Sequence, residues 1–294
     1  MEVVKYTLFF SLLSFIFNSC IREGEVECPP VNTLTISVLD KNYDNVSDIE
    51  GLTPIDENLS FQSYINPLSV LSEREGGTIE NKTITPEGNE TDYSMAVNSY
   101  ADGKYMFAIA GSYLFNDVDT DLENVSISLH PDNAESLDTY LGRKEVSLPL
   151  YANDTIGLTR TKGKLLLQFV GFPAEITKVD AEVSGVYASV NINGVYSGST
   201  TVYKTFVPGR PDMNSYYSMR LAPTADNTNS SLSLKLYGAT GNLITTLSNI
   251  EFDIIRNQLT VLQARYNPVE GKWEIYIFLN GQWKGIHNLD IIDE

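Results

Sequence analysis

The stretch WEIYIFLNGQWKGI, residues 273–286, decides the fold class. It holds two strand-like runs separated by Asn280-Gly281, a dipeptide that favours the type I′ turn of a two-residue β-hairpin. Asn193-Gly194 separates two further runs in the same way. We therefore predict an antiparallel hairpin over residues 273–286 and a second tight hairpin around Gly194.

Alternation of apolar and polar residues extends this pattern along the chain. In TLTISVL, residues 33–39, Leu34, Ile36 and Val38 point to one face while the threonine and serine side chains point to the other. This period of two is typical of a half-buried antiparallel strand. The same alternation recurs in VSISL (125–129), VYASVNI (186–192) and SLSLKLY (231–237). Two more runs, YMFAIA (105–110) and KLLLQF (164–169), indicate strands covered on both faces.

Helix signals are sparse, and the best is a short turn within residues 131–140. The sequence therefore predicts an all-β protein built from antiparallel β-sandwiches. Its length suits one large domain or two of ordinary size. Polar turn residues in PLYANDTIG, 149–157, mark a boundary. We predict two tandem sandwich domains over 29–152 and 153–294.

The first residues predict export. Residues 7–17, TLFFSLLSFIF, are apolar or hydroxylic and follow Lys5. The run is shorter than the ~20 residues that span a membrane, so it indicates a signal peptide over 1–19. Ser19 directly before Cys20 is the arrangement that bacterial lipoprotein processing requires, in a loose form that resembles lipoproteins of Bacteroidetes. We expect cleavage between Ser19 and Cys20, acylation of Cys20, and a tether over 20–28. The alternative is a disulfide with Cys28 in an exported protein.

The composition argues against several classes. The net charge is −18, from 38 acidic and 20 basic residues. Nucleic-acid binding needs clustered Lys and Arg, and the sequence has no such cluster, so we expect no nucleic-acid partner. After residue 17 no apolar run approaches membrane-spanning length. Apart from the signal peptide, the chain is expected to lie outside the bilayer.

Catalytic and cofactor motifs are missing from the sequence. Two cysteines and two histidines, His130 and His287, are too few and too far apart for a zinc site. No nucleophile elbow, dinucleotide fingerprint or phosphate loop occurs. We interpret each histidine as a surface or strand-end residue. The prediction is a protein that is not an enzyme and has no cofactor.

DVDTDLE, residues 117–123, is the most metal-like string, because Asp117, Asp119 and Asp121 echo the first ligands of a calcium loop. Leu122 stands where that loop needs Gly, and Ser128 stands where it needs Glu. The helix–loop–helix type is therefore excluded. An acidic surface loop is the preferred interpretation, with a looser calcium site as the alternative, so we assign no metal.

Two parts of the chain resemble a known family. The string C-I-R-E-G-(x)₃-C-P, residues 20–29, followed by a strand at 34–40, resembles the start of the fimbrillin-associated anchor and minor-subunit lipoproteins of Bacteroidales. Residues 236–266 resemble the core of that family's second domain. The resemblance implies two transthyretin-like sandwiches, a place in surface fimbriae, and other fimbrial subunits as partners. It also implies a lipid anchor in the outer membrane, with acyl chains as the membrane contact and the protein surface-exposed.

Arginine spacing bears on the role within a fibre. In fimbriae of this family, shaft subunits lose an N-terminal strand to an arginine-directed protease, and the open groove takes a strand from the next subunit. No arginine lies between Arg22 and Arg74, so the first strand, 33–39, has no nearby cut site on its C-terminal side. A retained strand fills its own groove, which predicts the anchor or base subunit. The alternatives are that arginine is simply rare here, or that Lys41 serves another protease.

On this interpretation the strand offered to the next subunit lies near the C-terminus. The candidate apolar side chains of this donor strand are Trp273, Ile275, Ile277, Leu279, Trp283 and Ile286. An ordinary hairpin that completes the second sandwich is an equal alternative.

A rival function comes from another class: a surface lipoprotein that binds glycans for a polysaccharide-uptake system. Such a protein needs exposed aromatic side chains, and Trp273, Trp283 and the pair Tyr216-Tyr217 are candidates. Base, minor shaft and tip positions in a fibre all remain open at this point.

Overall fold

The computed structural model describes residues 33–115, 122–208, 216–279 and 281–289. The predicted signal peptide, Ser19, Cys20 and Cys28 lie outside these residues, and so do Asp117, Asp119 and Asp121. The strands are β1 (Thr33–Val38), β2 (Leu68–Arg74), β3 (Ile79–Ile84), β4 (Tyr93–Ala96), β5 (Gly103–Gly111), β6 (Ser126–Ser128), β7 (Tyr140–Leu148), β8 (Thr155–Arg160), β9 (Gly163–Val170), β10 (Ile176–Val186), β11 (Ser189–Asn191), β12 (Tyr196–Ser197), β13 (Thr200–Phe206), β14 (Tyr216–Leu221), β15 (Ser230–Gly238), β16 (Leu243–Phe252), β17 (Leu259–Asn267), β18 (Lys272–Leu279) and β19 (Gln282–Leu289).

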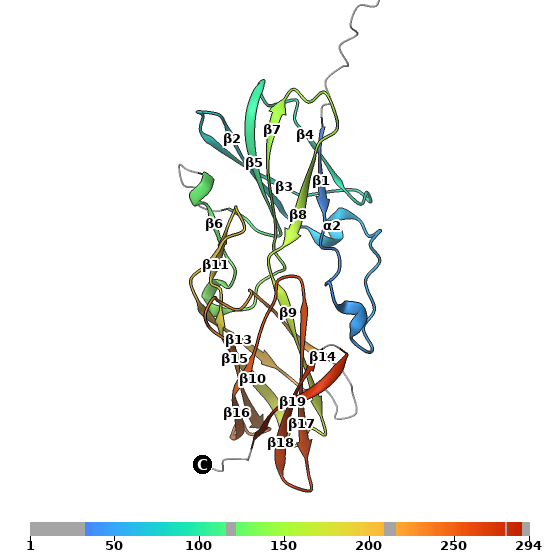
Figure 1. Ribbon diagram of the computed structural model, residues 1–294, viewed down its shortest axis with the longest axis vertical. Coiled ribbons are helices and arrows are strands. Elements are labelled where there is room, and N and C mark those ends of the chain that lie inside the picture. The colour runs from blue at the N-terminus through green and yellow to red at the C-terminus, as the bar shows by residue number, and fades with distance from the viewer. Residues whose placement is uncertain (1–32, 116–121, 209–215, 280, 290–294) are drawn as a thin grey trace, which may run out of the picture.

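Helices are few in the described part of the chain. One short α-helix, α2 (Phe61–Tyr64), and three 3₁₀ turns, η1 (Val46–Asp48), η2 (Leu122–Asn124) and η3 (Pro131–Asn133), connect the strands. The turn η3 falls within the predicted turn at 131–140. The prediction of an all-β sandwich fold is confirmed. Figure 1 shows an elongated molecule whose upper part is built from β1–β5, β7 and β8.

The upper part is a seven-stranded sheet with the order β3-β2-β5-β7-β8-β1-β4. β7 and β8 pair only through Tyr140 with Arg160 and Leu141 with Thr159, so the sheet has a weak seam there. The two sides of the seam share one core. Its buried residues include Leu34 and Ile36 from one side and Phe107 from the other.

The lower part is a sandwich of a four-stranded sheet, β13-β10-β15-β16, and a five-stranded sheet, β14-β9-β17-β18-β19. The alternation predicted in SLSLKLY is confirmed, because Leu232, Leu234 and Leu236 of β15 are buried in this core. β9 has apolar residues buried on both faces, with Leu166 and Leu167 as neighbours in the chain, as predicted for KLLLQF. The core therefore lies between the two sheets.

A small third sheet joins the two parts. It has the order β12-β11-β6, in which β6 comes from the first half of the chain and β11 from the second. Ile127 and Val190 are opposite each other in its register, and both are fully buried. Figure 1 shows this sheet beside the middle of the molecule. Apolar residues of the upper sheet, among them Leu71 and Ala108, belong to the same core cluster as Ile127.

Both predicted hairpins are confirmed. β18 and β19 pair antiparallel, with Leu279 opposite Gln282 across a two-residue loop. β11 and β12 pair around Gly194. Gly281 and Gly194 have φ of 76° and 78°, the left-handed region that glycine adopts without steric cost.

The chain passes from the upper sheet to the lower sandwich between β8 and β9. β8 pairs with β1 in the upper sheet, whereas β9 pairs with β14 and β17 in the lower sandwich. Thr161 and Lys162 form the connection, and both are buried. The domain boundaries 29–152 and 153–294 stay a prediction. The strand pairing shows that the chain passes from the upper sheet to the lower sandwich just after Arg160.

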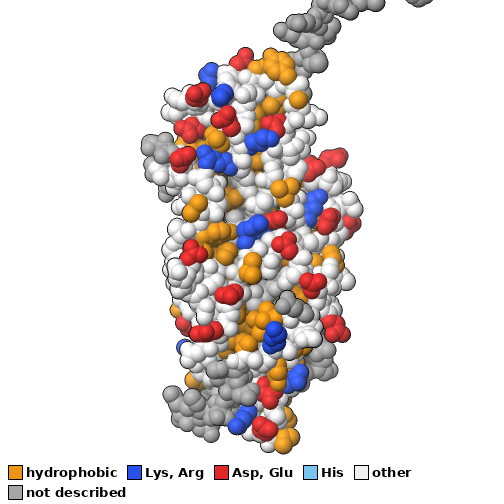
Figure 2. Space-filling view, in the orientation of Figure 1, with side chains coloured by type: hydrophobic (Ala, Val, Ile, Leu, Met, Phe, Trp, Pro, Cys, Tyr) orange, Lys and Arg blue, Asp and Glu red, His pale blue; other side chains and the backbone are white. Residues whose placement is uncertain are grey.

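The visible surface mixes both signs of charge. Figure 2 shows acidic and basic side chains interspersed over one face, with apolar patches between them. Within the described residues, no helix is long and apolar enough to cross a membrane.

Candidate subunit-assembly site

The first described strand, β1, is paired on both of its edges in the upper sheet. β1 runs antiparallel to β4 on one side and parallel to β8 on the other. Leu34 and Ile36 are fully buried, whereas Thr35 and Ser37, which alternate with them, are half-buried. This is the alternation that the sequence predicts. With both edges paired and one face in the core, β1 is an integral strand of its domain.

The segment that follows β1 binds the lower sandwich. Asp40 accepts two hydrogen bonds through Oδ2, from the Arg160 backbone N–H at 2.8 Å and from Arg256 Nη1 at 2.7 Å. Arg256 belongs to the loop that leads into β17. Since the Asp40 carboxylate is largely buried, this ion pair is better shielded from water than an ordinary surface pair.

Two more residues of this segment continue the contact. Asp44 and Asn257 exchange two hydrogen bonds, one between backbone atoms at 2.9 Å and one between side chains at 2.7 Å. The Asn45 side chain binds both backbone groups of Leu259 at 2.8 Å, as a neighbouring strand would. We call the set Asp40, Asp44 and Asn45 with Arg256, Asn257 and Leu259 the clasp. It ties the end of β1 to the first residues of β17.

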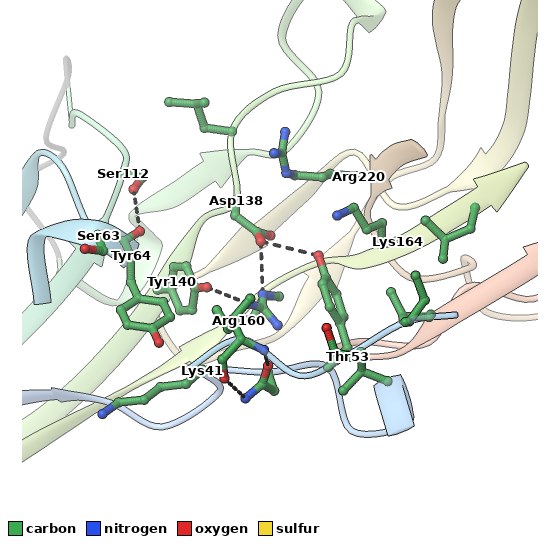
Figure 3. Close-up of a pocket in the computed structure, with 18 of the residues that line it drawn as sticks. Lys41, Thr53, Ser63, Tyr64, Ser112, Asp138, Tyr140, Arg160, Lys164 and Arg220 are labelled. Carbon is green, nitrogen blue, oxygen red and sulfur yellow. Dashed lines mark hydrogen bonds and ion pairs between the residues drawn. The ribbon is translucent and has the colours of Figure 1, made fainter. Parts of the chain in front are cut away.

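Buried charges lie beside the clasp at the domain junction. Arg160 Nε is 3.1 Å from Asp138 Oδ2, and Nη2 donates to the Tyr140 hydroxyl at 2.7 Å. The guanidinium also lies over the Tyr43 ring, 4.1 Å from its centroid. Figure 3 shows Arg160, Asp138 and Tyr140 converging in one pocket. Burial, with the Asp138 charge, raises the pKa of Tyr140 to about 12, so its phenol stays protonated near neutral pH.

A lysine and a histidine are also enclosed at the junction. Lys162 is fully buried and its ammonium donates to the Ser136 hydroxyl and to the Leu137 carbonyl. Burial lowers the pKa of Lys162 to about 8. His130 Nε2 accepts from the Ala222 N–H at 2.9 Å. Burial, with the nearby Lys162 charge, lowers the pKa of His130 to about 3, so the ring is neutral.

This placement corrects the interpretation of His130. The residue follows β6 closely, but it is buried rather than at the surface. Its ring links the small third sheet to β14 through the Ala222 N–H. A lone histidine in a polar stretch carries no sequence signal for such a role, because the partner is a backbone group far away in the chain. The side chain of His287 lies outside the described residues.

The C-terminal hairpin has one inner and one outer strand. β18 lies between β17 and β19, and Trp273, Ile275 and Ile277 are buried in the sandwich core. β19 is the edge strand and pairs with β18 alone among the described strands. Trp283 of β19 is 39% exposed and packs against Phe278 with ring centroids 5.2 Å apart.

The structure separates the predicted donor residues accordingly. Leu279 is exposed at the end of β18, and Ile286 of β19 is half-buried against the core. Trp273 is 1% exposed, so it cannot form part of an exposed aromatic platform for glycans. Tyr216 and Tyr217 of β14 are half-buried.

The described residues contain no candidate metal site. They contain no group of three or more His, Cys, Asp or Glu side chains placed to hold an ion. Because the aspartates at 117–121 fall outside these residues, the loose calcium candidate stays a hypothesis.

Comparison with known proteins identifies the fold. No family model matches the chain. No curated protein matches it either. Among solved structures, a candidate adhesin from Bacteroides ovatus has a TM-score of 0.55 at 15% identity, covering 88% of this chain and 97% of the other. A candidate polysaccharide-binding protein from Bacteroides thetaiotaomicron has a TM-score of 0.54 at 14% identity, covering 87% and 99%.

Fimbrial proteins are found among the more distant neighbours. The fimbrial anchor protein Mfa2 from Porphyromonas gingivalis has a TM-score of 0.47 at 12% identity, covering 87% of this chain and 99% of the other. That likeness is too distant to carry a role over. These structures are described as adhesin, polysaccharide-binding and fimbrial anchor proteins. The chain therefore shares its fold with candidate adhesin and polysaccharide-binding proteins from Bacteroides species.

Proposed function

We propose that the protein is a lipid-anchored fimbrial subunit and that it forms the anchor, or base, that tethers a fibre to the outer membrane. The observation that carries the proposal is that β1 is paired on both edges and has one face buried in the core. A subunit whose first strand is paired on both edges and buried has no open groove for a strand from another subunit. Such a subunit can end a fibre but cannot extend it on that side.

The arginine pattern supports a strand that stays in place. Arg74, the next arginine after Arg22, is the last residue of β2. A cut after Arg74 would release β1 together with α2 and β2, and β2 pairs with both β3 and β5. Removing it would divide the upper sheet and not merely open a groove. An arginine-directed protease therefore has no productive site here.

The lipid anchor rests on the sequence of residues 1–28, and Cys20 is its proposed acylation site. The proposed partners are other fimbrial subunits and, through the acyl chains, the outer membrane. N-terminal analysis of the protein isolated from cell surfaces tests this directly. Acylated Cys20 is the expected result, whereas a free N-terminus beyond β1 would identify a processed, polymerising subunit.

The outward contact is proposed to use the C-terminal hairpin. Among the described strands β19 pairs with β18 alone, whereas β18 has two neighbours, so β19 is the strand that can leave or pair with another chain. Deleting residues 281–294 should release fimbriae from cells while Cys20 stays acylated. Unchanged cell-bound fimbriae would contradict a role of β19 in assembly.

A single substitution tests the proteolysis argument. Lys41 lies three residues after β1, and the Lys41→Arg variant keeps its charge while creating an arginine site between β1 and the rest of the chain. We expect an arginine-directed protease to cut the variant after residue 41 and to leave the natural chain intact there. Lys104→Arg is the matched control, because Lys104 is exposed within β5. Cleavage of the natural chain just after β1 would contradict the anchor assignment.

A surface glycan-binding lipoprotein is the second candidate. A pocket with three tyrosines among its lining residues, Tyr43, Tyr64 and Tyr140, is the observation in its favour. A neighbour described as a polysaccharide-binding protein shares the fold. Genes for other fimbrial subunits beside this one would favour the anchor, and genes for glycan import would favour the second candidate.

A further inference from the structure

The junction pocket is a cavity of about 560 Å³ between the upper sheet and the lower sandwich. Small-molecule sites in proteins have volumes of about 300–1,000 Å³, so this one suits a ligand of one or two sugar units in size. Its walls come from the segment after β1, from α2, and from the ends of strands in both parts. Figure 3 shows the lining side chains pointing into a shared space.

The charge of the lining is opposite to that of the chain. The protein has a net charge of −18, yet the lining residues include four cations, Lys41, Arg160, Lys164 and Arg220, against one carboxylate, Asp138. Like charges gathered in a partly enclosed cavity repel one another unless an anion is present. The pocket is therefore a local positive site on an acidic protein.

Lys164 forms no direct ion pair in the part of the chain that the structure describes, and the Asp138 and Glu135 charges act on it only from further away. Arg160 is paired with Asp138, Arg220 Nη1 lies 3.5 Å from Glu135, and Lys41 donates to the Glu57 carbonyl. The Lys164 ammonium has no hydrogen bond or carboxylate partner among the described residues, and its nearest recorded contact is the Tyr43 ring at 5.5 Å. Burial and the Arg220 charge lower the pKa of Lys164. A bound anion would offset both effects, because a nearby negative charge stabilises the charged ammonium.

Uncharged hydrogen-bonding groups line the same cavity. Thr53, Ser63, Asn66 and Ser112 contribute hydroxyl and carboxamide groups. Within the described residues, the Thr53 hydroxyl and the Asn66 carboxamide have no hydrogen-bond partner. Figure 3 shows Ser63 and Ser112 on one side of the pocket beside Tyr64, and Lys164 and Arg220 on the other. The ligand should therefore be charged at one end and hydroxylated at the other.

We propose that the junction pocket binds a saccharide that carries a carboxylate, with the carboxylate at Lys164 and Arg220 and the sugar hydroxyls at Thr53 and Asn66. Tyr64 offers an aromatic ring on the hydroxyl side, against which the apolar face of a sugar ring can pack. A small inorganic anion would fill only the cationic end of a cavity this large. The pocket is separate from β19, so this inference stands or falls independently of the anchor role.

Binding can be measured by calorimetry on the chain from residue 29 onward, with digalacturonate as the probe. Cellobiose is the neutral control of the same size, and glutarate is a carboxylate without a sugar. We expect digalacturonate to bind at least tenfold more tightly than either control. Equal binding of cellobiose would refute the charged end, equal binding of glutarate would refute the sugar end, and no binding of digalacturonate would refute the site.

Substitutions locate the site. Lys164→Gln should weaken digalacturonate binding about tenfold or more, since a hydrogen bond to a charged group is lost. Lys164→Arg should retain most of the affinity, and Lys104→Gln, an equal charge change on the exposed surface, should leave it unchanged. Thr53→Val, in an exposed position, tests the contact with the sugar hydroxyls without touching a charge and should weaken binding a few-fold. Unaltered affinity in both Lys164→Gln and Thr53→Val would overturn the proposal.

Discussion

β1 and β19, the first and last strands that the structure describes, are held in opposite ways. β1 has a partner on each edge and presents Leu34 and Ile36 to the core. β19 has one partner, β18, and exposes Trp283. Both segments are apolar enough to form strands, so composition alone does not show how many partners each strand has. The difference lies in the number of neighbours that the topology gives each strand.

The comparison indicates where assembly can take place without loss of the fold. Removing a strand with two partners breaks two sets of backbone hydrogen bonds and opens a core. Moving an edge strand breaks one set and leaves the other strands of the sheet paired. An interacting surface built on β19 is therefore compatible with a stable subunit, whereas one that needs the groove of β1 is not.

The largest effect should come from the β1 core. Ile36→Ala should lower the free energy of unfolding by about 2–5 kcal/mol, because it leaves a cavity at a fully buried site. Thr35→Ala in the same strand is half-buried and serves as the control, with a smaller expected loss. Urea unfolding measures both. Equal midpoints for the two variants would mean that β1 is not an integral strand.

The clasp should come next. Asp40→Ala removes the acceptor for Arg256 and for the Arg160 N–H, and it should cost about 1–3 kcal/mol of unfolding free energy. Asp40→Asn keeps an acceptor and should cost less. Thermal unfolding of the two variants measures the difference. An unaltered midpoint for Asp40→Ala would show that β1 is held by the upper sheet alone.

Acid should weaken the interior in a defined window. The pKa of His130 is about 3 in the folded chain and about 6.5 when unfolded, so the unfolded state binds more protons between these values. Stability is therefore fully present above about pH 6.5 and falls as the pH drops, by about 1.4 kcal/mol per pH unit. Comparing unfolding midpoints above about pH 5, where most carboxylates remain charged, isolates this term. The His130→Gln variant should lose the slope, and a retained slope would assign it to another group.

The smallest effect on stability is expected in β19. Trp283→Ala should change the free energy of unfolding by about 1 kcal/mol or less, mainly through the lost ring contact with Phe278. The same variant should reduce retention of fimbriae on cells if β19 makes the outward contact. Unfolding curves and counts of cell-bound fimbriae are measured together. A loss of stability as large as that of Ile36→Ala would remove the contrast between the two strands.

The sequence was informative where local chemistry determines structure. Alternation gave the buried faces of β1 and β15, and the Asn-Gly dipeptides gave both hairpins. These features depend on residues close together in the chain. The same reasoning could not foresee that β1 runs parallel to β8, or that β6 pairs with β11, because the partners are far apart in sequence.

The sequence did not predict which polar residues are buried. Arg160, Lys162 and His130 are of types that are usually exposed, and their sequence neighbours give no sign of burial. Each is enclosed because two parts of the chain meet around it and supply a partner, such as Asp138 for Arg160. The junction pocket was missed for the same reason. Its lining residues run from Lys41 to Leu259, and no motif connects them.

The direction of β1 has a mechanical consequence. β1 begins at one end of the elongated molecule and β19 lies toward the other, as Figure 1 shows. Tension between a tether before β1 and a contact on β19 therefore acts along β1 and not across it. Pulled in this direction, the hydrogen bonds to β4 and β8 are sheared together instead of being opened one after another. The clasp then passes part of the load from the end of β1 to the loop before β17, which would help the proposed anchor to resist detachment under flow.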